Sequence, residues 1–558
     1  MRGVTRSRNS ILRAAPGALA GLLAAYAALA VAELVAGAVR PAAGPVTVVG
    51  GVVIDRTPAS VKDFAIRTFG ENDKAVLQFG IYVLLALSAV ALGALAVSGR
   101  RRAGAAGVVS FGIVGAAAAL SRPDSTGWGD ALPSLAGAVA GAGVLYVLVG
   151  RVIAAEAPAA GSAAVEPPAA GSAADSPAAG SAASEVSVGA EGSGGGWNRR
   201  GFLGVAAVTA AAATGAGTLG RFLAGRRGRS AVASRDALAL PAPASPAPAV
   251  PSASRLPVAG ISAFTTPNHD FYRVDTALVV PRVDAAAWAL RIHGRGVSRP
   301  RTYTLDQLLA RPLVERDITL ACVSNEVGGP YVGNARWLGV PLAGLLAECG
   351  VRPPSRGGTA DQLVSRSVDG MTLGTPVEDV MDGRDAMLAV GMNGEPLPFE
   401  HGFPVRMLVP GLYGYVSACK WIEDIELTTF DAYDPYWVKR DWARRAPVKT
   451  QSRIDTPRPF ARPAAGTVMV AGVAWAQHRG IERVEVRIDD GPWQAADLAA
   501  QNTVDTWRQW SFPWRAAPGG HTVTVRATDG TGAVQTERRT RTAPDGASGR
   551  HSVFVTVL

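Results

Sequence analysis

The sequence predicts a multi-domain protein with three folded parts: an N-terminal α-helical membrane part, an α+β domain and a C-terminal β-sandwich. Five apolar stretches precede residue 225, short alternating and helical runs fill residues 263–448, and β-runs at regular spacing fill residues 449–558. A chain of 558 residues is long enough for several domains. Its 48% hydrophobic and 18% charged content suits membrane segments combined with a globular core.

The membrane part is predicted from stretches of about 20 mostly apolar residues, the length with which a helix crosses a bilayer. They cover roughly residues 14–38, 75–98, 103–120, 131–150 and 202–219. Several such stretches with basic flanks favour membrane helices over Ala-rich helices of a soluble core. We therefore expect a four-helix transmembrane domain over residues 1–152 and a fifth transmembrane helix over residues 201–224.

Basic residues predict the orientation, because positively charged flanks stay in the cytoplasm. The basic start of the chain and residues 99–104 are expected inside, and the loop between the first two helices outside. Arg199 and Arg200 resemble a twin-arginine export signal in an internal position, with ordinary cytoplasmic arginines as the alternative. The fifth helix then places the chain after about residue 225 outside. The sequence thus predicts a multi-pass plasma-membrane protein whose globular part is extracytoplasmic.

Two segments are predicted to be linkers from their composition. Residues 153–200 repeat a "PAAGSAA" theme, whose small and polar side chains cannot bury enough apolar surface to fold. Residues 225–262 include the Pro/Ala/Ser-rich run "LPAPASPAPAVPSAS". We expect the first linker to be flexible and the second to space the globular part from the membrane.

The composition argues against several classes of function. The net charge of +10 comes almost entirely from arginine in an Ala- and Gly-rich chain, so it is weak evidence for nucleic-acid binding and no such partner is predicted. None of the six histidines precedes His269, which excludes a bis-histidine haem in the membrane part. The sequence has no CxxC motif and no histidine cluster, so zinc is not expected. Three cysteines are too few for a disulfide scaffold.

Local patterns predict the elements of the α+β domain. "YRVDTALVV" (272–280) and "WALRIHG" (288–294) are typical of strands. "TLDQLLA" (304–310) predicts a short helix with its first residue, a threonine, as the cap. "VPLAGLLAECGV" (340–351) predicts a further helix that ends at Gly350.

The last part of the chain has the pattern of an immunoglobulin-like β-sandwich. Its β-runs include "GTVMVAGVAWAQ", "IERVEVRIDDG" and "HTVTVRATDGTG", and turn residues separate them at regular spacing. We expect Trp507, Trp510 and Trp514 to form a core cluster there.

Cys322 follows a short apolar run and precedes the loop-like stretch "VSNEVGGPYVGNAR". On the residues alone, three roles are open. It is a buried small hydrophobe, half of a disulfide with Cys349 or Cys419, or a thiolate ligand at the end of a strand. The backbone donors of the following stretch favour a ligand site.

Several motifs follow Cys322 in a fixed order. "TLACVSN" is followed by "GNARWLGVPLAGLL", which we expect to open a helix, then by "MNGEPLPFEHGFPVRMLVPGLYG" (392–414) and "SACKWI" (417–422). Together they resemble the sulfite oxidase family of molybdenum-cofactor oxidoreductases. The resemblance covers residues from about 263 to 558, and in it the β-sandwich corresponds to the family's dimerisation domain.

The resemblance implies a cofactor site for molybdenum held by molybdopterin. Cys322 would be the thiolate ligand of the metal. The positions that match cofactor-holding residues of the family are His269, Tyr272, Arg273, His401, Arg406, Ser417 and Lys420. Arginine and lysine suit this role, because the pterin ends in a phosphate.

Two departures from the family argue against sulfite as substrate. The stretch after Cys322 contains Glu326 and has no arginine before Arg336, although the family binds its oxyanion with arginines there. Trp442 stands where the family has a tyrosine. An acidic group would repel a dianion, so a neutral or cationic substrate such as a sulfoxide or N-oxide is expected. Glu326 and Trp442 are candidate catalytic residues, together with Cys322 and Tyr272.

The sequence therefore predicts a membrane-anchored, extracytoplasmic molybdenum-cofactor oxidoreductase. It would carry out two-electron oxygen-atom transfer on a small-molecule substrate, in the direction of either oxidation or reduction. No haem, flavin or iron–sulfur motif is visible, so a separate electron partner is expected, either a quinol-linked membrane protein or a cytochrome. The resemblance also implies a homodimer. The alternative is a surface-tethered, non-catalytic binding module with a degenerate molybdopterin domain.

Overall fold

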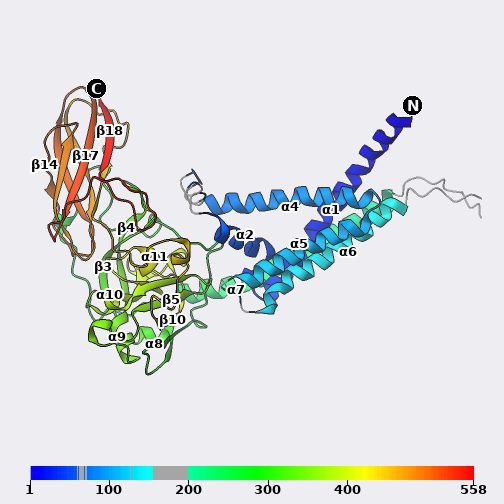
Figure 1. Ribbon diagram of the computed structural model, residues 1–558, viewed down its shortest axis with the longest axis horizontal. Coiled ribbons are helices and arrows are strands. Elements are labelled where there is room, and N and C mark those ends of the chain that lie inside the picture. Colours follow the sequence, from blue (N-terminus) through cyan, green and yellow to red (C-terminus); the bar gives the residue numbers. More distant parts are fainter. Residues whose placement is uncertain are drawn as a thin grey trace, which may run out of the picture. The chain divides into compact units, whose positions relative to one another are not determined.

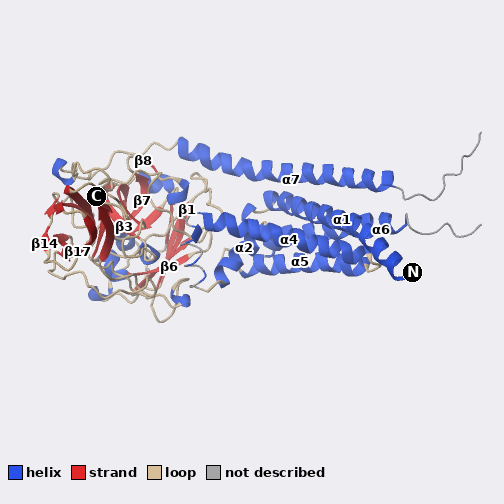
Figure 2. Cartoon of the chain, turned by 90° about the horizontal axis from the view of Figure 1, so that it is seen from above, coloured by secondary structure: helices blue, strands red, loops and turns tan. Residues whose placement is uncertain are grey.

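The computed structural model of the chain is shown in Figures 1 and 2. It describes residues 2–154 and 199–558, apart from residues 59, 60, 62, 63, 65–67, 70, 71, 123 and 126. Most of the predicted first linker, residues 155–198, lies outside the described residues. The chain divides into two compact units, a helical one and a mixed one.

The helical unit contains long apolar helices that run side by side (Figure 2). They are α1 (Arg2–Ala38), α4 (Asp73–Val97), α5 (Arg101–Ser121), α6 (Leu132–Ala154) and α7 (Arg199–Asp236). In the described part of the chain, five helices are long and apolar enough to cross a membrane, and they coincide with the five predicted stretches. Helix α7 extends to Asp236, so the second linker begins after this residue and not at residue 225.

Small residues bring α1 and α4 into backbone contact. A Cβ added at Gly21 would lie 2.0 Å from the carbonyl oxygen of Ala89, and one added at Gly93 would lie 2.0 Å from that of Gly17. Only glycine fits at such a contact, which is the close helix packing that Ala/Gly-rich membrane segments permit.

The second unit includes more than the globular domains. It comprises Gly51–Lys74, Ser121–Ser125 and Gly225–Leu558. The first segment contains the end of helix α2 (Pro45–Arg56), and the second follows α5. Two short segments between the long apolar helices therefore belong to the same compact unit as the globular part.

The first sheet of the α+β domain presents the cysteine loop. Its order is β3-β4-β7-β8, with β9 paired to β7. The strands are β3 (Val314–Ala321), β4 (Val332–Pro341), β7 (Met387–Met392), β8 (Glu395–Pro396) and β9 (Arg406–Leu408). Ala321 pairs with Val332, so residues 322–331 form the loop of an antiparallel hairpin that begins at Cys322.

The second sheet has the order β2-β1-β10-β5-β6. Its strands are β1 (Ala289–Gly294), β2 (Arg301–Thr304), β5 (Gln362–Ser367), β6 (Thr372–Pro376) and β10 (Ile422–Thr428). The helices of the domain are α8 (Leu305–Leu309), α9 (Leu342–Glu348), α10 (Val377–Met381) and α11 (Gly414–Ser417). The predicted cap is confirmed, because the Thr304 hydroxyl accepts from the Gln307 N–H in a capping box.

Two predictions for this domain are wrong. The "GNARW" segment lies within β4 and opens no helix, because β4 is a nearly fully buried strand between β3 and β7, and α9 begins only at Leu342. Residues 272–280 form no strand. Residues 272–280 make the contacts described below through their side chains, and not through the backbone hydrogen bonds of a sheet.

The C-terminal part consists of two four-stranded sheets that enclose one apolar core. One sheet contains β11 (Gln451–Thr456), β12 (Gly466–Trp475), β16 (Arg508–Ala516) and β15 (Asp497–Leu498). The other contains β14 (Gln494–Ala495), β13 (Ile481–Ile488), β17 (Gly519–Asp529) and β18 (His551–Val557). The immunoglobulin-like topology stays a prediction.

The three C-terminal tryptophans do not form one cluster. Trp510 and Trp514 lie in the C-terminal core, but Trp507 packs into the core of the α+β domain. Its indole N–H donates to the carbonyl oxygen of Phe264 at 2.8 Å, and its backbone N–H donates to the Thr319 hydroxyl at 2.7 Å. Trp507 therefore joins the two domains.

Candidate cofactor site

Cys322 is held at the start of the hairpin loop by backbone hydrogen bonds. Its N–H donates to the carbonyl oxygen of Tyr331 at 2.9 Å, and the Ser324 N–H lies 3.4 Å from its sulfur. The side chain is buried, with 8% exposed. Burial raises the pKa of the Cys322 thiol, and the Ser324 N–H only partly opposes this. A bound metal ion would supply the positive charge that a buried thiolate needs.

All three cysteines are free and buried, so the structure does not contain the disulfide that was one alternative for Cys322.

Aromatic side chains of residues 271–272 face the cysteine loop. Tyr272 stacks on Phe271 with ring centroids 5.2 Å apart, and it meets the Tyr331 ring edge-on at 6.3 Å. Burial raises the pKa of Tyr272, and the nearby Cys322 sulfur raises it further. The Tyr272 phenol therefore keeps its proton and can act as a hydrogen-bond donor.

Arg406 places an unmatched positive charge in the same region. Its side chain is 5% exposed, its Nη1 donates to the carbonyl oxygen of His401 at 3.1 Å, and its guanidinium lies 5.1 Å from the centre of the Trp337 ring. Among the residues that the structure describes, its Nε–H has no hydrogen-bond partner. Burial lowers the pKa of Arg406 to about 10, which still leaves it charged at neutral pH. Such a charge is costly to bury without an anion.

His401 is neutral beside this arginine. Burial and then the charge of Arg406 lower the pKa of His401 to about 4. Its Nε2 lies 3.0 Å from the carbonyl oxygen of Asn268, a contact that requires the Nε2–H tautomer and leaves Nδ1 as an acceptor. The ring also meets Phe271 edge-on, with centroids 5.5 Å apart.

The carboxylate of Asp275 binds the remaining basic side chains of the site. Its Oδ2 accepts from the Lys420 ammonium at 2.8 Å and from the Arg273 Nε at 3.2 Å. Lys420 also donates to the carbonyl oxygen of Glu400 at 2.9 Å. Burial lowers the pKa of Lys420 to about 8, whereas Asp275 acts to raise it.

A cavity of about 380 Å³ opens next to these groups. Its lining includes His269, Arg273, Arg282, Phe399, Glu400 and His401. The His269 side chain is 81% exposed and lies 3.3 Å from the carboxylate of Asp270.

Three predicted residues lie differently from the others. The Ser417 hydroxyl is buried and donates to the carbonyl oxygens of Leu412 and Tyr413, so its side chain serves the local backbone. Glu326 is exposed on the cysteine loop. Trp442 is buried in an aromatic cluster with Tyr415 and Trp437, and no described contact links it to Cys322.

The sequence analysis missed Asp275, Asn268 and Phe271 as parts of the site. All three lie within residues 266–275, around Tyr272, and the clustering of polar and aromatic residues there is the signal that could have identified them. Their roles depend on contacts with residues more than 100 positions later in the chain.

Comparison with known proteins identifies the domain that holds this site. Residues 277–437 match the family described as oxidoreductase molybdopterin-binding domain. The chain is 29% identical over 294 residues to mitochondrial sulfite oxidase of Rattus norvegicus, which covers 45% of this chain and 53% of that protein. This domain belongs to the sulfite oxidase family of molybdopterin oxidoreductases.

Two further matches extend the comparison. Nitrate reductase [NADH] 1 of Oryza sativa subsp. japonica is 34% identical over 183 residues, or 29% of this chain and 20% of that protein. The crystal structure of the sulfane dehydrogenase SoxCD from Paracoccus pantotrophus is 25% identical with a TM-score of 0.46, covering 53% of this chain and 82% of that chain. The chain spans about half the length of the sulfite oxidases that it matches.

The residues present fit the molybdenum–molybdopterin cofactor of the sulfite oxidase family. The site offers the buried thiol of Cys322, at the start of the hairpin loop, as a metal ligand. The basic side chains of Arg273 and Lys420 share one carboxylate, Asp275, and Arg406 has no carboxylate among its described contacts. An anionic phosphate group would balance the excess positive charge and give the orphan N–H of Arg406 an acceptor.

Proposed function

We propose that the chain is a membrane-anchored molybdenum-cofactor oxidoreductase with an extracytoplasmic catalytic domain, acting on a small molecule other than sulfite. The observation that supports it best is the buried guanidinium of Arg406, which has no carboxylate among its described contacts, in a family domain whose hairpin loop begins with a buried thiol. A charge of this kind is stable in a binding site for an anion.

In this proposal, Cys322 ligates the molybdenum, while Arg406, Lys420 and Arg273 hold the pterin phosphate. The bound cofactor supplies two-electron oxygen-atom transfer. Tyr272 carries a proton at neutral pH and can donate a hydrogen bond beside Cys322. His401 stays neutral and, through Asn268, holds the segment that bears Tyr272.

The cysteine loop supports a substrate that is not a dianion. It carries the exposed Glu326, and no arginine occurs between Cys322 and Arg336. Arg453 does reach this loop and donates to the carbonyl oxygen of Gly329 at 2.9 Å, but its charge is matched by Asp455 at 2.7 Å. A neutral or cationic molecule such as a sulfoxide or N-oxide suits this balance better than sulfite does.

The placement of the loops supports the predicted topology. The basic flanks predict that the segments after the first, third and fifth membrane helices lie on one side of the membrane. These are the segments that share one compact unit: Gly51–Lys74, Ser121–Ser125 and Gly225–Leu558. We infer that this side is extracytoplasmic and that electrons are exchanged there with a quinol-linked membrane protein or a cytochrome. A homodimer remains part of the proposal.

The first test is the molybdenum content of the full chain, purified in detergent from a host that makes the cofactor. We expect about one molybdenum per chain in the wild type and in Cys349→Ser, whose buried thiol contacts the Tyr303 hydroxyl. Cys322→Ser should lose most of the metal or change its spectrum. Wild-type protein without molybdenum or pterin would contradict the proposal and favour the binding-module alternative. Faster turnover of sulfite than of any neutral sulfoxide or N-oxide would contradict the substrate class.

A further inference from the structure

The carboxylate of Asp275, which binds basic residues of the cofactor site, also binds Lys74 of a predicted membrane helix. Lys74 is the second residue of α4, and its ammonium lies 2.5 Å from Oδ1 of Asp275. The Oδ2 atom of the same carboxylate accepts from Lys420 and Arg273. The side chains of Lys74 and Asp275 are 19% and 7% exposed, so this contact is largely shielded from water. All four residues belong to the same compact unit.

Asp275 is ionised in this arrangement. Burial acts to raise its pKa, but the charges and hydrogen bonds of Lys420 and Lys74 together outweigh burial and hold the pKa well below its usual range. A charged carboxylate shared by several cations has a fixed position, because each of its oxygens is engaged by a charge-assisted hydrogen bond.

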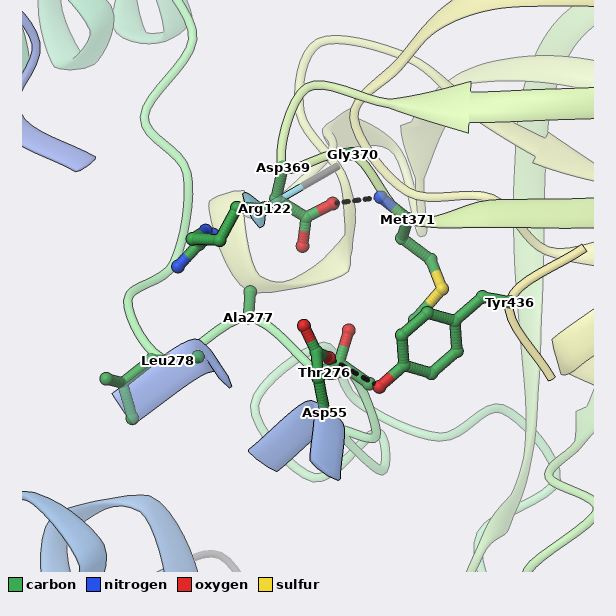
Figure 3. A pocket seen from close by; sticks show the side chains of 10 residues that line it. Asp55, Arg122, Thr276, Ala277, Leu278, Asp369, Gly370, Met371 and Tyr436 are labelled. Carbon is green, nitrogen blue, oxygen red and sulfur yellow. Dashed lines mark hydrogen bonds between the residues drawn. The ribbon is translucent and has the colours of Figure 1, made fainter. Parts of the chain in front are cut away.

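Further contacts near Asp275 involve the two segments that lie between the long helices, Gly51–Lys74 and Ser121–Ser125. The Tyr436 hydroxyl donates to Asp55 at 2.6 Å, and Arg440 donates to the backbone carbonyl of Asp55 at 3.1 Å. Figure 3 shows a small polar cavity lined by Asp55 and Tyr436, with Arg122 and Thr276 also in its wall. Its volume of about 30 Å³ leaves room for one or two water molecules. Thr276 directly follows Asp275, so these segments cover the continuation of the cofactor-site segment.

We propose that Lys74 is a positioning residue of the cofactor site, which makes the segment between the first two long helices a component of that site as well as a connection. Lys74 fixes Asp275, and Asp275 in turn sets the positions of Lys420 and Arg273. Because Lys74 occupies Oδ1, the other two cations share only Oδ2 and keep positive charge available for an anionic ligand. The inference rests on the proposed function, since the anionic ligand is the cofactor.

The test measures cofactor retention in the full-length protein in detergent. Lys74→Met removes the charge and keeps the length of the side chain, Lys74→Arg keeps the charge, and Arg56→Met removes an exposed positive charge from the same segment. Molybdenum and pterin remaining with the protein are followed over time during gel filtration and mild heating. Lys74→Met should lose both about tenfold faster than the wild type, whereas Lys74→Arg and Arg56→Met should stay within about twofold of it.

Retention of the cofactor by Lys74→Met at the wild-type rate would overturn the inference. If Lys74→Met does not fold, Asp275→Asn decides: it keeps the shape of the side chain and should also release the cofactor about tenfold faster. Unchanged retention in Asp275→Asn would equally overturn it. A wild-type protein that contains no molybdenum would reject the proposed function itself, and this outcome is distinct from an effect of the variants.

Discussion

The molybdopterin domain and the C-terminal sheets use buried charge in different ways. In the C-terminal part, Arg526 lies 2.8 Å from Glu485 and Arg479 lies 3.0 Å from Asp529. In the molybdopterin domain, Arg406 is buried without a described carboxylate, and three other cations converge on Asp275. Both parts have well-packed apolar cores, so the hydrophobic cores do not distinguish them.

This difference indicates where the ligand binds. Matched pairs stabilise a fold or are neutral to it, whereas a buried cation without an anion lowers the stability of the empty protein. The unmatched charge of Arg406, close to Tyr272 and His401, therefore marks the place in the molybdopterin domain where an anionic ligand would bind.

The variant Arg406→Met should have the largest effect. The full-length protein should hold less than about a tenth of the wild-type molybdenum, because the phosphate loses a charge-assisted partner. The cofactor-free protein should unfold at the same or a higher temperature, since an apolar side chain removes the cost of burying a charge. Metal analysis and thermal unfolding measure the two effects. Arg526→Met is the matched control and should keep its molybdenum. A normal metal content in Arg406→Met would show that this charge serves the fold alone.

Trp510→Ala tests the opposite domain. Trp510 is fully buried in the C-terminal core, so its truncation should lower the free energy of unfolding by about 3–5 kcal/mol. Molybdenum per folded chain should not change. Denaturant unfolding followed by fluorescence gives the first quantity and metal analysis the second. Loss of metal from the folded variant would mean that the two domains are not separate in function.

Lowering the pH should have a smaller effect, and this effect is on the free energy of unfolding. The pKa of His401 is about 4 in the folded protein and 6.5 in the unfolded chain, so its contribution to stability is complete above about pH 6.5 and is lost as the pH falls towards 4. The loss should reach about 3 kcal/mol in the cofactor-free protein. Unfolding measured between these pH values should show a weaker dependence in His401→Gln. An identical dependence in both proteins would contradict the assignment to His401.

The smallest effect is expected for Glu485→Gln. The Glu485–Arg526 pair joins the neighbouring central strands β13 and β17, and Arg526 keeps its contact with the Trp493 ring at 4.3 Å. Removing the charge of Glu485 should cost about 0.2–1 kcal/mol in unfolding free energy. Thermal unfolding of the variant measures this. A cost well above that range would mean that this pair is as important as the buried charges of the cofactor site.

Local patterns in the sequence predicted much of the fold. The five long apolar helices and the Thr304 cap depend on neighbouring residues, so they could be read from the chain. The helix start at "GNARW" was expected from the resemblance, but the segment lies in strand β4, where Asn334 and Arg336 bind Thr319 and Asp317 of the neighbouring strand. Residues 272–280 were misassigned because their alternation reflects side-chain contacts with the site and not a strand ladder.

The candidate site was predictable only as far as its motifs extend. The resemblance identified Tyr272, His401, Arg406 and Lys420, and the structure brings all four near one another. The contact between Lys74 and Asp275 could not be predicted, because 201 positions separate them and the pairing depends on how the chain folds. The exposure of Glu326 likewise follows from the shape of the hairpin loop.

The contact between Asp55 and Tyr436 has a consequence for biosynthesis. These residues are 381 positions apart, so the first partner is synthesised long before the second. Since domains form in order from the N-terminus during translation, the segment around Asp55 must wait without its partner until the chain has been made as far as Tyr436. Joining the two also closes a very long loop, whose entropic cost grows only slowly with length. Docking of the globular domain on this segment is therefore a late step in the maturation of the protein.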